Sequence, residues 1–369
     1  MRKFFLRNRD ILTVVIILFV WRVYSLSIQF ASNNIPVRSG YLGFLRIANF
    51  DGVYYLYISQ FGYHGLDQSF FPLFPILITS VMRFTSLAPI NAAILVVIGS
   101  LFIALYTFCK LIKLDQKNGN YIWALIFFLS FPTSFFFGAI YTESLFLGLS
   151  FLAFYFTRRR NYILGSVFAM FASATRIVGI FLLPALLLEV YDSQKKKEKR
   201  SILAYLPLAI IPLGLLSYMG FLWYRYGDPL LFVHIQPAFG AGRSGGEIIL
   251  LPQVIYRYIK ILTSIPTSEL TFWISCLESV CLLLGGVVLY LAYKKGVRRS
   301  YILFSVATLL FPTLSGTLSS LPRYMLCSFA IFIYLGMIKS RVIKTSLIVI
   351  GLVLQCVLAT LFLQGYFVS

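Results

Sequence analysis

The chain has 369 residues, of which 59% are apolar and 12% charged, and its formal net charge at pH 7 is +20. Soluble domains carry about 25% charged residues, so this composition excludes a soluble protein and is typical of an integral membrane protein. The five cysteines all lie in apolar runs and the two histidines are far apart. No disulfide framework and no metal site is therefore predicted.

The positive charge follows a pattern that membrane topology explains. Of the 32 basic residues, 22 fall in six bursts between apolar runs, at 2–9, 110–117, 158–160, 195–200, 294–299 and 339–344. Short basic loops mark the cytoplasmic side of a membrane protein. We predict an inside N-terminus and no nucleic-acid partner. Acidic residues beside these loops, among them Asp115 and Glu189, are expected to be solvated counter-charges.

The first apolar run, 11–30, predicts an uncleaved membrane span, because the run is long and no clear cleavage site follows it. A signal peptide is the alternative. An outer loop at 31–88 comes next, and a second one at 225–270. The other spans are predicted at 89–112, 121–138, 142–157, 161–191 (two spans), 202–224, 271–292, 300–318, 323–338 and 343–363. The two spans within 161–191 divide near Ala174-Thr175-Arg176. The chain is thus predicted to be one all-α transmembrane domain, residues 1–369, with about 11 helices.

The first outer loop contains two unusual segments. The apolar run 76–84 follows the proline-rich sequence 70–75 and is short. If it crossed the membrane, every later basic loop would lie outside, so we predict a half-buried or interfacial segment on the outer side. The aromatic-rich segment 51–63 predicts a short helix on the outer membrane surface.

The twelve carboxylates are few enough to sort by position. Most lie beside inner loops, in turns or at helix starts. Glu278 is inside a predicted span, where a carboxylate is costly, so its side chain is expected to face the interior of the bundle. Asp51, Asp67 and Glu143 remain as candidates on the outer face. For Asp51, an Asp-Gly turn or a helix cap worth about 1 kcal/mol is the structural alternative.

The ten basic residues outside the six bursts are almost all arginine. They are Arg22, Arg38, Arg46, Arg83, Arg176, Arg225, Arg243, Arg257, Lys260 and Arg323. Arginine can contact two phosphate oxygens at once, which suits phosphate binding in a partly dry site. Arg176 and Arg323 lie at outer ends of predicted spans and are our candidates for a phosphate site. Snorkelling to lipid headgroups is the alternative for each.

The sequence Gly240-Ala241-Gly242-Arg243-Ser244-Gly245 spells GxGxxG. This pattern indicates a dinucleotide site only after a strand and before a helix. It lies here in an outer loop between spans, so dinucleotide binding is not predicted.

Five motifs then occur in a recognisable order. They are Phe50-Asp51-Gly52, Ile58 with Phe61-Gly62-Tyr63, the segment 70–75, the segment 141–146 around Glu143, and Ala174-Thr175-Arg176 with Gly179. Together they resemble the GPI mannosyltransferase II family, in a short, prokaryote-like form. The resemblance covers about residues 40–190, and Pro322-Arg323-Tyr324 extends it. The chain differs from the family in having Phe50 where tryptophan is usual.

This resemblance implies a GT-C mannosyltransferase that takes mannose from a polyprenyl-phosphate donor on the extracytoplasmic face and inverts the anomeric carbon. It also implies an essential acid in the first outer loop, a position that Asp51 matches. Asp67 and Glu143 are expected to be secondary acids, and Arg176 and Arg323 to bind the donor phosphate. No metal or other cofactor is expected.

The acceptor stays open among a glycan, a glycolipid and a protein. The expected location is the plasma membrane of a prokaryote or the endoplasmic reticulum membrane of a eukaryote. A secondary transporter or a lipid flippase is the alternative to an enzyme. Transporters often show repeated halves and broken helices, and no two-fold repeat is visible in this sequence.

Overall fold

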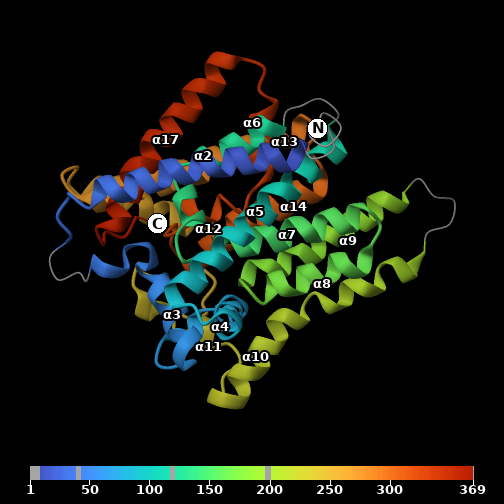
Figure 1. Ribbon diagram of the computed structural model, residues 1–369, viewed down its shortest axis with the longest axis horizontal. Helices are drawn as coiled ribbons and strands as arrows, with labels where there is room; N and C mark the ends of the chain where they lie inside the picture. Colours follow the sequence, from blue (N-terminus) through green and yellow to red (C-terminus); the bar gives the residue numbers. More distant parts are fainter. Residues whose placement is uncertain (1–8, 39–42, 117–120, 196–200, 369) are drawn as a thin grey trace.

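The computed structural model describes residues 9–38, 43–116, 121–195 and 201–368, and these residues form an all-helical molecule without strands (Figure 1). Parts of three predicted basic bursts, at 2–7, 117 and 196–200, lie outside the described residues.

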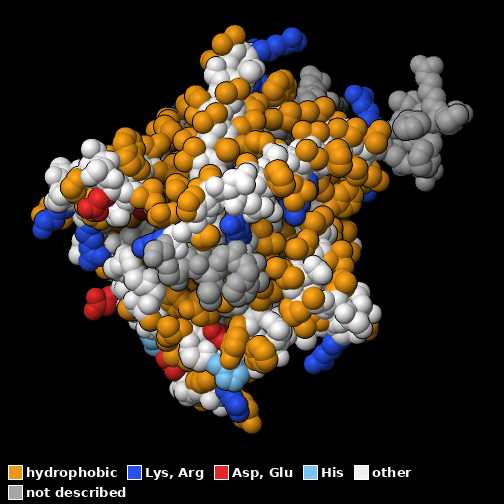
Figure 2. Space-filling view, turned by 60° about the vertical axis from the view of Figure 1, so that its left-hand side comes forward, with side chains coloured by type: hydrophobic (Ala, Val, Ile, Leu, Met, Phe, Trp, Pro, Cys, Tyr) orange, Lys and Arg blue, Asp and Glu red, His pale blue; other side chains and the backbone are white. Residues whose placement is uncertain are grey.

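Six helical segments among the described residues are long and apolar enough to cross a membrane. They are α2 (Arg9–Ser32), α5 (Pro89–Asp115), η4 with α9 (Ile177–Gln194), η5 to α10 (Ile202–Tyr226), α13 (Leu270–Lys294) and α17 (Arg341–Leu363). Each coincides with a span predicted from the sequence. Figure 2 shows many hydrophobic side chains over the upper part of one face, with Lys and Arg at its margins and at a few places within it. Such a surface is suited to contact with lipid.

The remaining predicted spans consist of shorter helices. They are α6 (Tyr121–Ser130) with η3 (Ser134–Phe137), α7 (Glu143–Arg158), α8 (Tyr162–Ser173), α14 (Arg299–Leu310) with η8 (Phe311–Ser315), and α15 (Leu321–Tyr324) with α16 (Ala330–Met337). Prolines explain several interruptions, because proline has no N–H for the helix ladder. Pro132 follows α6, Pro312 lies in η8 and Pro322 lies in α15. The count of about 11 spans stays a prediction.

The two predicted outer loops carry helices of their own. The first contains η1 (Gly43–Ala48), α3 (Asp51–Phe61), η2 (Asp67–Ser69) and α4 (Leu73–Thr85). The second contains α11 (Leu231–His234), η7 (Gln236–Phe239) and α12 (Leu251–Ser264). The predicted helix at 51–63 is thus confirmed as a helix. With its 13 residues, α4 is about 20 Å long, shorter than the roughly 30 Å of a bilayer core.

The centre of the molecule is a close-packed aromatic core between α5, α7 and α16. The rings of Phe108 and Phe151 stack at 4.8 Å, and Phe329 meets the Phe151 ring edge-on at 5.1 Å. A Cβ at Gly148 would lie 3.2 Å from the Ser100 carbonyl oxygen, so glycine lets α7 approach α5 closely. This packing fixes α7, whose first residue is Glu143.

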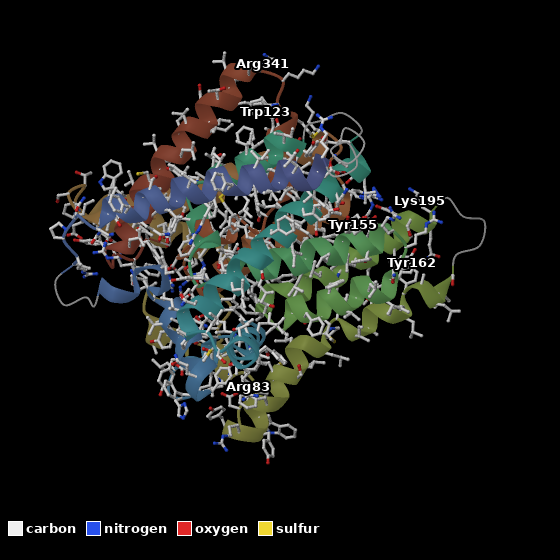
Figure 3. The ribbon with its side chains drawn as sticks, in the orientation of Figure 1. Arg83, Trp123, Tyr155, Tyr162, Lys195 and Arg341 are labelled. Atoms are coloured by element: carbon white, nitrogen blue, oxygen red, sulfur yellow. The ribbon has the colours of Figure 1, made fainter. Side chains whose placement is uncertain are left out.

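Several residues near predicted inner loops lie on margins of the molecule away from α4. Figure 3 shows Trp123, Tyr162, Lys195 and Arg341 along the upper and right margin, and Arg83 of α4 on the opposite margin. The assignment of these two margins to the inner and outer sides of the membrane stays a prediction.

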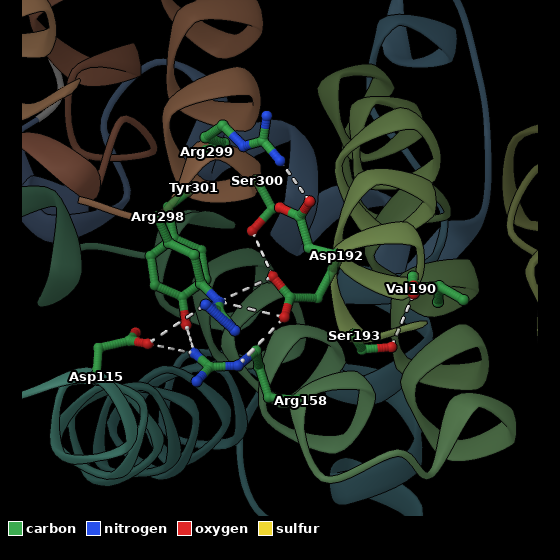
Figure 4. A network of polar contacts seen from close by, with 10 residues as sticks. Asp115, Arg158, Val190, Asp192, Ser193, Arg298, Arg299, Ser300 and Tyr301 are labelled. Atoms are coloured by element: carbon green, nitrogen blue, oxygen red, sulfur yellow. Dashed lines mark hydrogen bonds and ion pairs between the residues drawn. The ribbon is translucent and has the colours of Figure 1, made fainter. Parts of the chain in front are cut away.

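An ion network joins α5, α7, α9 and α14 near one set of ends (Figure 4). Arg158 contacts Asp115 at 2.7 Å and Glu189 at 3.2 Å, and Arg298 contacts Glu189 at 3.1 Å. The Ser300 hydroxyl also donates to Glu189. Glu189 is buried, so the expectation that it is a solvated counter-charge is wrong. A buried carboxylate requires such partners because it has lost its hydration.

Candidate active site

A cavity of about 670 Å³ opens where the two predicted outer loops meet the bundle. This volume lies within the usual range of small-molecule sites. Its wall comes from the start of α3, the end of η2, the α8–η4 break, the second outer loop and the segment from η8 to α15. Residues of the wall include Asp51, Tyr54, Phe70, Thr142, Arg176, Gln236, Phe239, Arg243, Ser319, Ser320 and Arg323.

Four charged side chains form a chain of ion pairs at this cavity. Arg323 Nη1 lies 2.8 Å from Asp51 Oδ2, and Arg323 Nε lies 2.8 Å from Glu143 Oε1. Arg176 Nη1 pairs with the same Glu143 oxygen and also donates to the Thr142 hydroxyl. The two carboxylates and two guanidinium groups have a net formal charge of zero.

Burial distinguishes the members of this network. The Glu143 side chain is 0% exposed and those of Arg176 and Arg323 are 7% and 11% exposed, whereas the Asp51 side chain is 25% exposed. Asp51 is therefore the carboxylate of the network that a ligand in the cavity can reach. Both arginines are paired and buried, so the alternative that they snorkel to lipid headgroups is wrong.

Aromatic rings hold the two guanidinium groups in place. The Arg176 guanidinium lies over the Tyr324 ring at 4.8 Å, and that of Arg323 over the Tyr141 ring at 5.0 Å. Such cation–π contacts favour one position of each charge.

The Phe50-Asp51-Gly52 motif has a local structural basis. Phe50 has a φ of 56°, which is strained for a residue with a bulky side chain, and it precedes the first turn of α3. A Cβ at Gly52 would lie 3.1 Å from the Ile140 carbonyl oxygen. This close approach sets the start of α3 beside the chain that leads into Glu143. Phe50 makes no side-chain cap, and Asp51 pairs with Arg323, so the alternative of an Asp51 helix cap is not realised.

The predicted break at Ala174-Thr175-Arg176 is present between α8 and η4. A Cβ at Gly179 would lie 2.5 Å from the Ala172 carbonyl oxygen, so only glycine fits where η4 turns back against α8. The Ala174 carbonyl accepts a hydrogen bond from the Leu73 N–H at 3.2 Å. The break therefore joins the first residue of α4 to the loop that carries Arg176.

Of the five predicted site residues, the structure brings four together and leaves Asp67 apart. Asp67 is buried in η2, where its Oδ2 accepts the His64 N–H at 3.3 Å. Burial raises the pKa of the Asp67 carboxyl, and the His64 hydrogen bond offsets this only in part. Asp67 is not among the residues of the cavity wall, and its contacts are those of a loop-stabilising side chain.

The second predicted outer loop contributes cavity residues that were not among the site residues predicted from the sequence. This loop brings Arg243, Gln236 and Phe239 to the cavity. The Phe239 ring contacts Tyr54 at 5.8 Å and Phe70 at 5.8 Å, so it continues the aromatic wall of the first loop. The presence of Arg243 among the arginines outside the inner loops was the signal that could have identified it.

The helical bundle, its apolar surface and the cavity with its network of charged side chains define a membrane protein with a charged site. The sequence matches the family described as Mannosyltransferase (PIG-V) over residues 12–224, more than half of the chain. The chain belongs to this family, which confirms the resemblance found in the sequence, and it is a membrane mannosyltransferase. No curated protein gives a significant match to the chain.

Proposed function

We propose that this mannosyltransferase takes mannose from a polyprenyl-phosphate donor and transfers it, with inversion, to an acceptor hydroxyl on the extracytoplasmic face. The proposal includes a GT-C architecture with about 11 spans, in the plasma membrane or the endoplasmic reticulum membrane. The observation that carries it is the partly exposed Asp51 carboxylate at a cavity whose wall also holds Arg176 and Arg323.

In this mechanism Asp51 is the general base. Its carboxylate accepts the proton of the acceptor hydroxyl while the hydroxyl oxygen bonds to the anomeric carbon. The bond from that carbon to the phosphate oxygen breaks, and its electron pair leaves with the polyprenyl phosphate. Because a single displacement occurs, the configuration inverts. The phosphate is a good leaving group, so the second carboxylate that glycosidases need as an acid has no counterpart here.

Arg176 and Arg323 are proposed to stabilise the departing phosphate. The described polar contacts of Arg176 use Nη1 and those of Arg323 use Nη1 and Nε, so the Nη2 group of each guanidinium remains to donate to a phosphate. Glu143 keeps both arginines in position. No group of three or more metal-binding side chains occurs among the described residues. The proposed chemistry needs no metal.

The test uses membrane vesicles from cells that make the protein and its acceptor, with polyprenyl-phosphate mannose labelled in the sugar, and vesicles from cells without the protein as the control. Transfer of label to a new glycoside, unaffected by a chelator, is the expected result. Movement of labelled lipid across the bilayer without a new glycoside would favour a flippase or transporter instead. The glycan lost when the protein is deleted identifies the acceptor.

A further inference from the structure

One arginine of the cavity wall, Arg243, differs from Arg176 and Arg323 in its ion pairing. Arg176 and Arg323 are compensated by Glu143 and Asp51, so their network has no net charge. Arg243 also lies in the cavity wall. Within the part of the chain that the structure describes, no carboxylate lies within 4.0 Å of its guanidinium group. Glu247 also lines the cavity, but it is exposed, where solvent weakens its effect. The buried Glu278 carboxylate interacts with Arg243 electrostatically without forming an ion pair with it, and it instead accepts a hydrogen bond from the Tyr258 hydroxyl.

The hydrogen bonds of Arg243 are long and go to neutral oxygens. Its Nη1 lies 3.4 Å from Gln236 Oε1, and its Nη2 lies 3.5 Å from the Ser319 and Ser320 hydroxyl oxygens. Hydrogen bonds from guanidinium to an anionic oxygen are about 2.7–2.9 Å and roughly twice as strong as neutral ones. The guanidinium of Arg243 therefore retains most of its capacity to bind an anion.

The backbone around Arg243 is held in place against the opposite wall. The Ser244 N–H donates to the Ser315 carbonyl at 2.8 Å, and the Ile249 N–H donates to the Leu314 carbonyl at 2.9 Å. Gly240 and Gly242 have φ values of 74° and 65°, which glycine adopts without strain. The glycines of the GxGxxG sequence thus shape a turn that presents Arg243 to the cavity.

We infer that Arg243 binds the phosphate of the lipid-linked substrate and supplies the net positive charge of the site. This inference rests on the proposed polyprenyl-phosphate donor. The donor is a phosphodiester with one negative charge, and the departing polyprenyl phosphate carries more. The ion network can donate hydrogen bonds to either phosphate but adds no net charge, whereas Arg243 adds a charge that has no ion-pair partner among the described residues of the cavity. The binding of the product lipid should therefore depend on Arg243.

The experiment measures binding of radiolabelled polyprenyl phosphate to the purified full-length chain, with unlabelled polyprenyl phosphate or polyprenol as competitor. Arg243→Gln is expected to weaken polyprenyl phosphate binding at least about tenfold, or about 1.4 kcal/mol. Arg225→Gln is the matched control, because Arg225 is exposed at the end of α10 and outside the cavity wall. It should bind like the wild type.

Two outcomes separate this inference from the proposed function. If the wild type does not prefer polyprenyl phosphate to polyprenol, the proposed donor is wrong and the inference is wrong with it. If the wild type shows the preference and Arg243→Gln keeps it undiminished, Arg243 alone is wrongly assigned. Should the Gln variant not fold, Arg243→Lys takes its place. We expect severalfold weaker binding because lysine cannot contact two oxygens as a fork, and wild-type affinity would overturn the inference.

Discussion

At the scale of single residues, position in the network separates side chains of the same chemistry. Asp51 and Asp67 are aspartates of the same outer loop, yet Asp51 reaches the cavity and Asp67 is buried away from its wall. Glu143 contacts both buried arginines and is itself fully buried. We therefore expect a different effect on activity and stability when Asp51, Asp67 or Glu143 is replaced by the corresponding amide.

Asp51→Asn is expected to abolish mannosyl transfer, because an amide cannot accept the proton of the acceptor hydroxyl. Turnover is measured with labelled donor in membranes, after expression has been matched. Asp67→Asn is the control: the amide oxygen still accepts the His64 N–H, and activity should persist. Near-normal turnover of Asp51→Asn would show that the base is another group.

The control variant Asp67→Asn also has a predicted effect on the stability of the fold. The folded-state pKa of Asp67 is raised above its ordinary value, so ionising the carboxyl costs folding free energy as pH rises through that window. At neutral pH the neutral asparagine avoids this cost. The melting temperature of Asp67→Asn at pH 7 should therefore be no lower than that of the wild type.

Glu143→Gln is expected to lower stability on the order of 3 kcal/mol, because it leaves two buried guanidinium groups without their shared carboxylate. The melting temperature in detergent should fall more than for Asp51→Asn, whose carboxylate is partly exposed. Activity should decrease less than in Asp51→Asn when both are measured well below their melting temperatures. A greater loss in Glu143→Gln under those conditions would make Glu143 the better candidate for the base.

At the scale of elements, short interruptions of helices place the charged groups. The α8–η4 break carries Arg176, and the segment from η8 to α15 carries Arg323. In a continuous helix, the backbone at these arginines would keep regular i→i−4 hydrogen bonds along the span. The breaks instead let each backbone turn so that its arginine reaches Glu143.

Gly179→Ala tests the first of these breaks. A methyl group 2.5 Å from the Ala172 carbonyl oxygen forces the backbone to shift, which costs about 1–3 kcal/mol. Because Arg176 is three residues away, turnover should fall together with the melting temperature. Gly220→Ala in α10 is the control, since nothing lies within 4 Å of its added Cβ. Equal behaviour of the two variants would contradict the close approach.

At the scale of the whole molecule, the long helix α5 separates two sides. Thr85 precedes α5 and Gln116 follows it, and 27 residues of helix span about 40 Å. If α4 stays on the outer side, as its length and the basic loops predict, these two positions lie on opposite faces of the membrane.

Cysteine labelling measures this topology directly. In a background without the five native cysteines, Thr85→Cys should react with an impermeant thiol reagent added from outside. Gln116→Cys should react only after the membrane is permeabilised. The reverse pattern would place the cavity, and with it the proposed catalysis, on the cytoplasmic side.

Much of this protein was determined by local sequence patterns. Apolar length predicted the six long helices, Ala174-Thr175-Arg176 marked the break before η4, and the motif order identified the family. These features depend on residues close together in the chain, so the sequence contains them directly. The sequence also selected Asp51, Glu143, Arg176 and Arg323 as candidates, because charged residues are costly in such an apolar chain.

The pairing of those candidates depended on the tertiary structure. Asp51 and Arg323 are 272 residues apart in sequence, and their contact exists only because α3 and α15 pack at one cavity. The packing of the helices likewise leaves Asp67 outside the cavity wall and brings Arg243 into it. A side chain's partners at such separations follow from how the helices pack, and no local pattern records that packing. The sequence therefore determined which groups were available, and the fold decided which of them share a site, because ion pairing requires distances of a few ångströms.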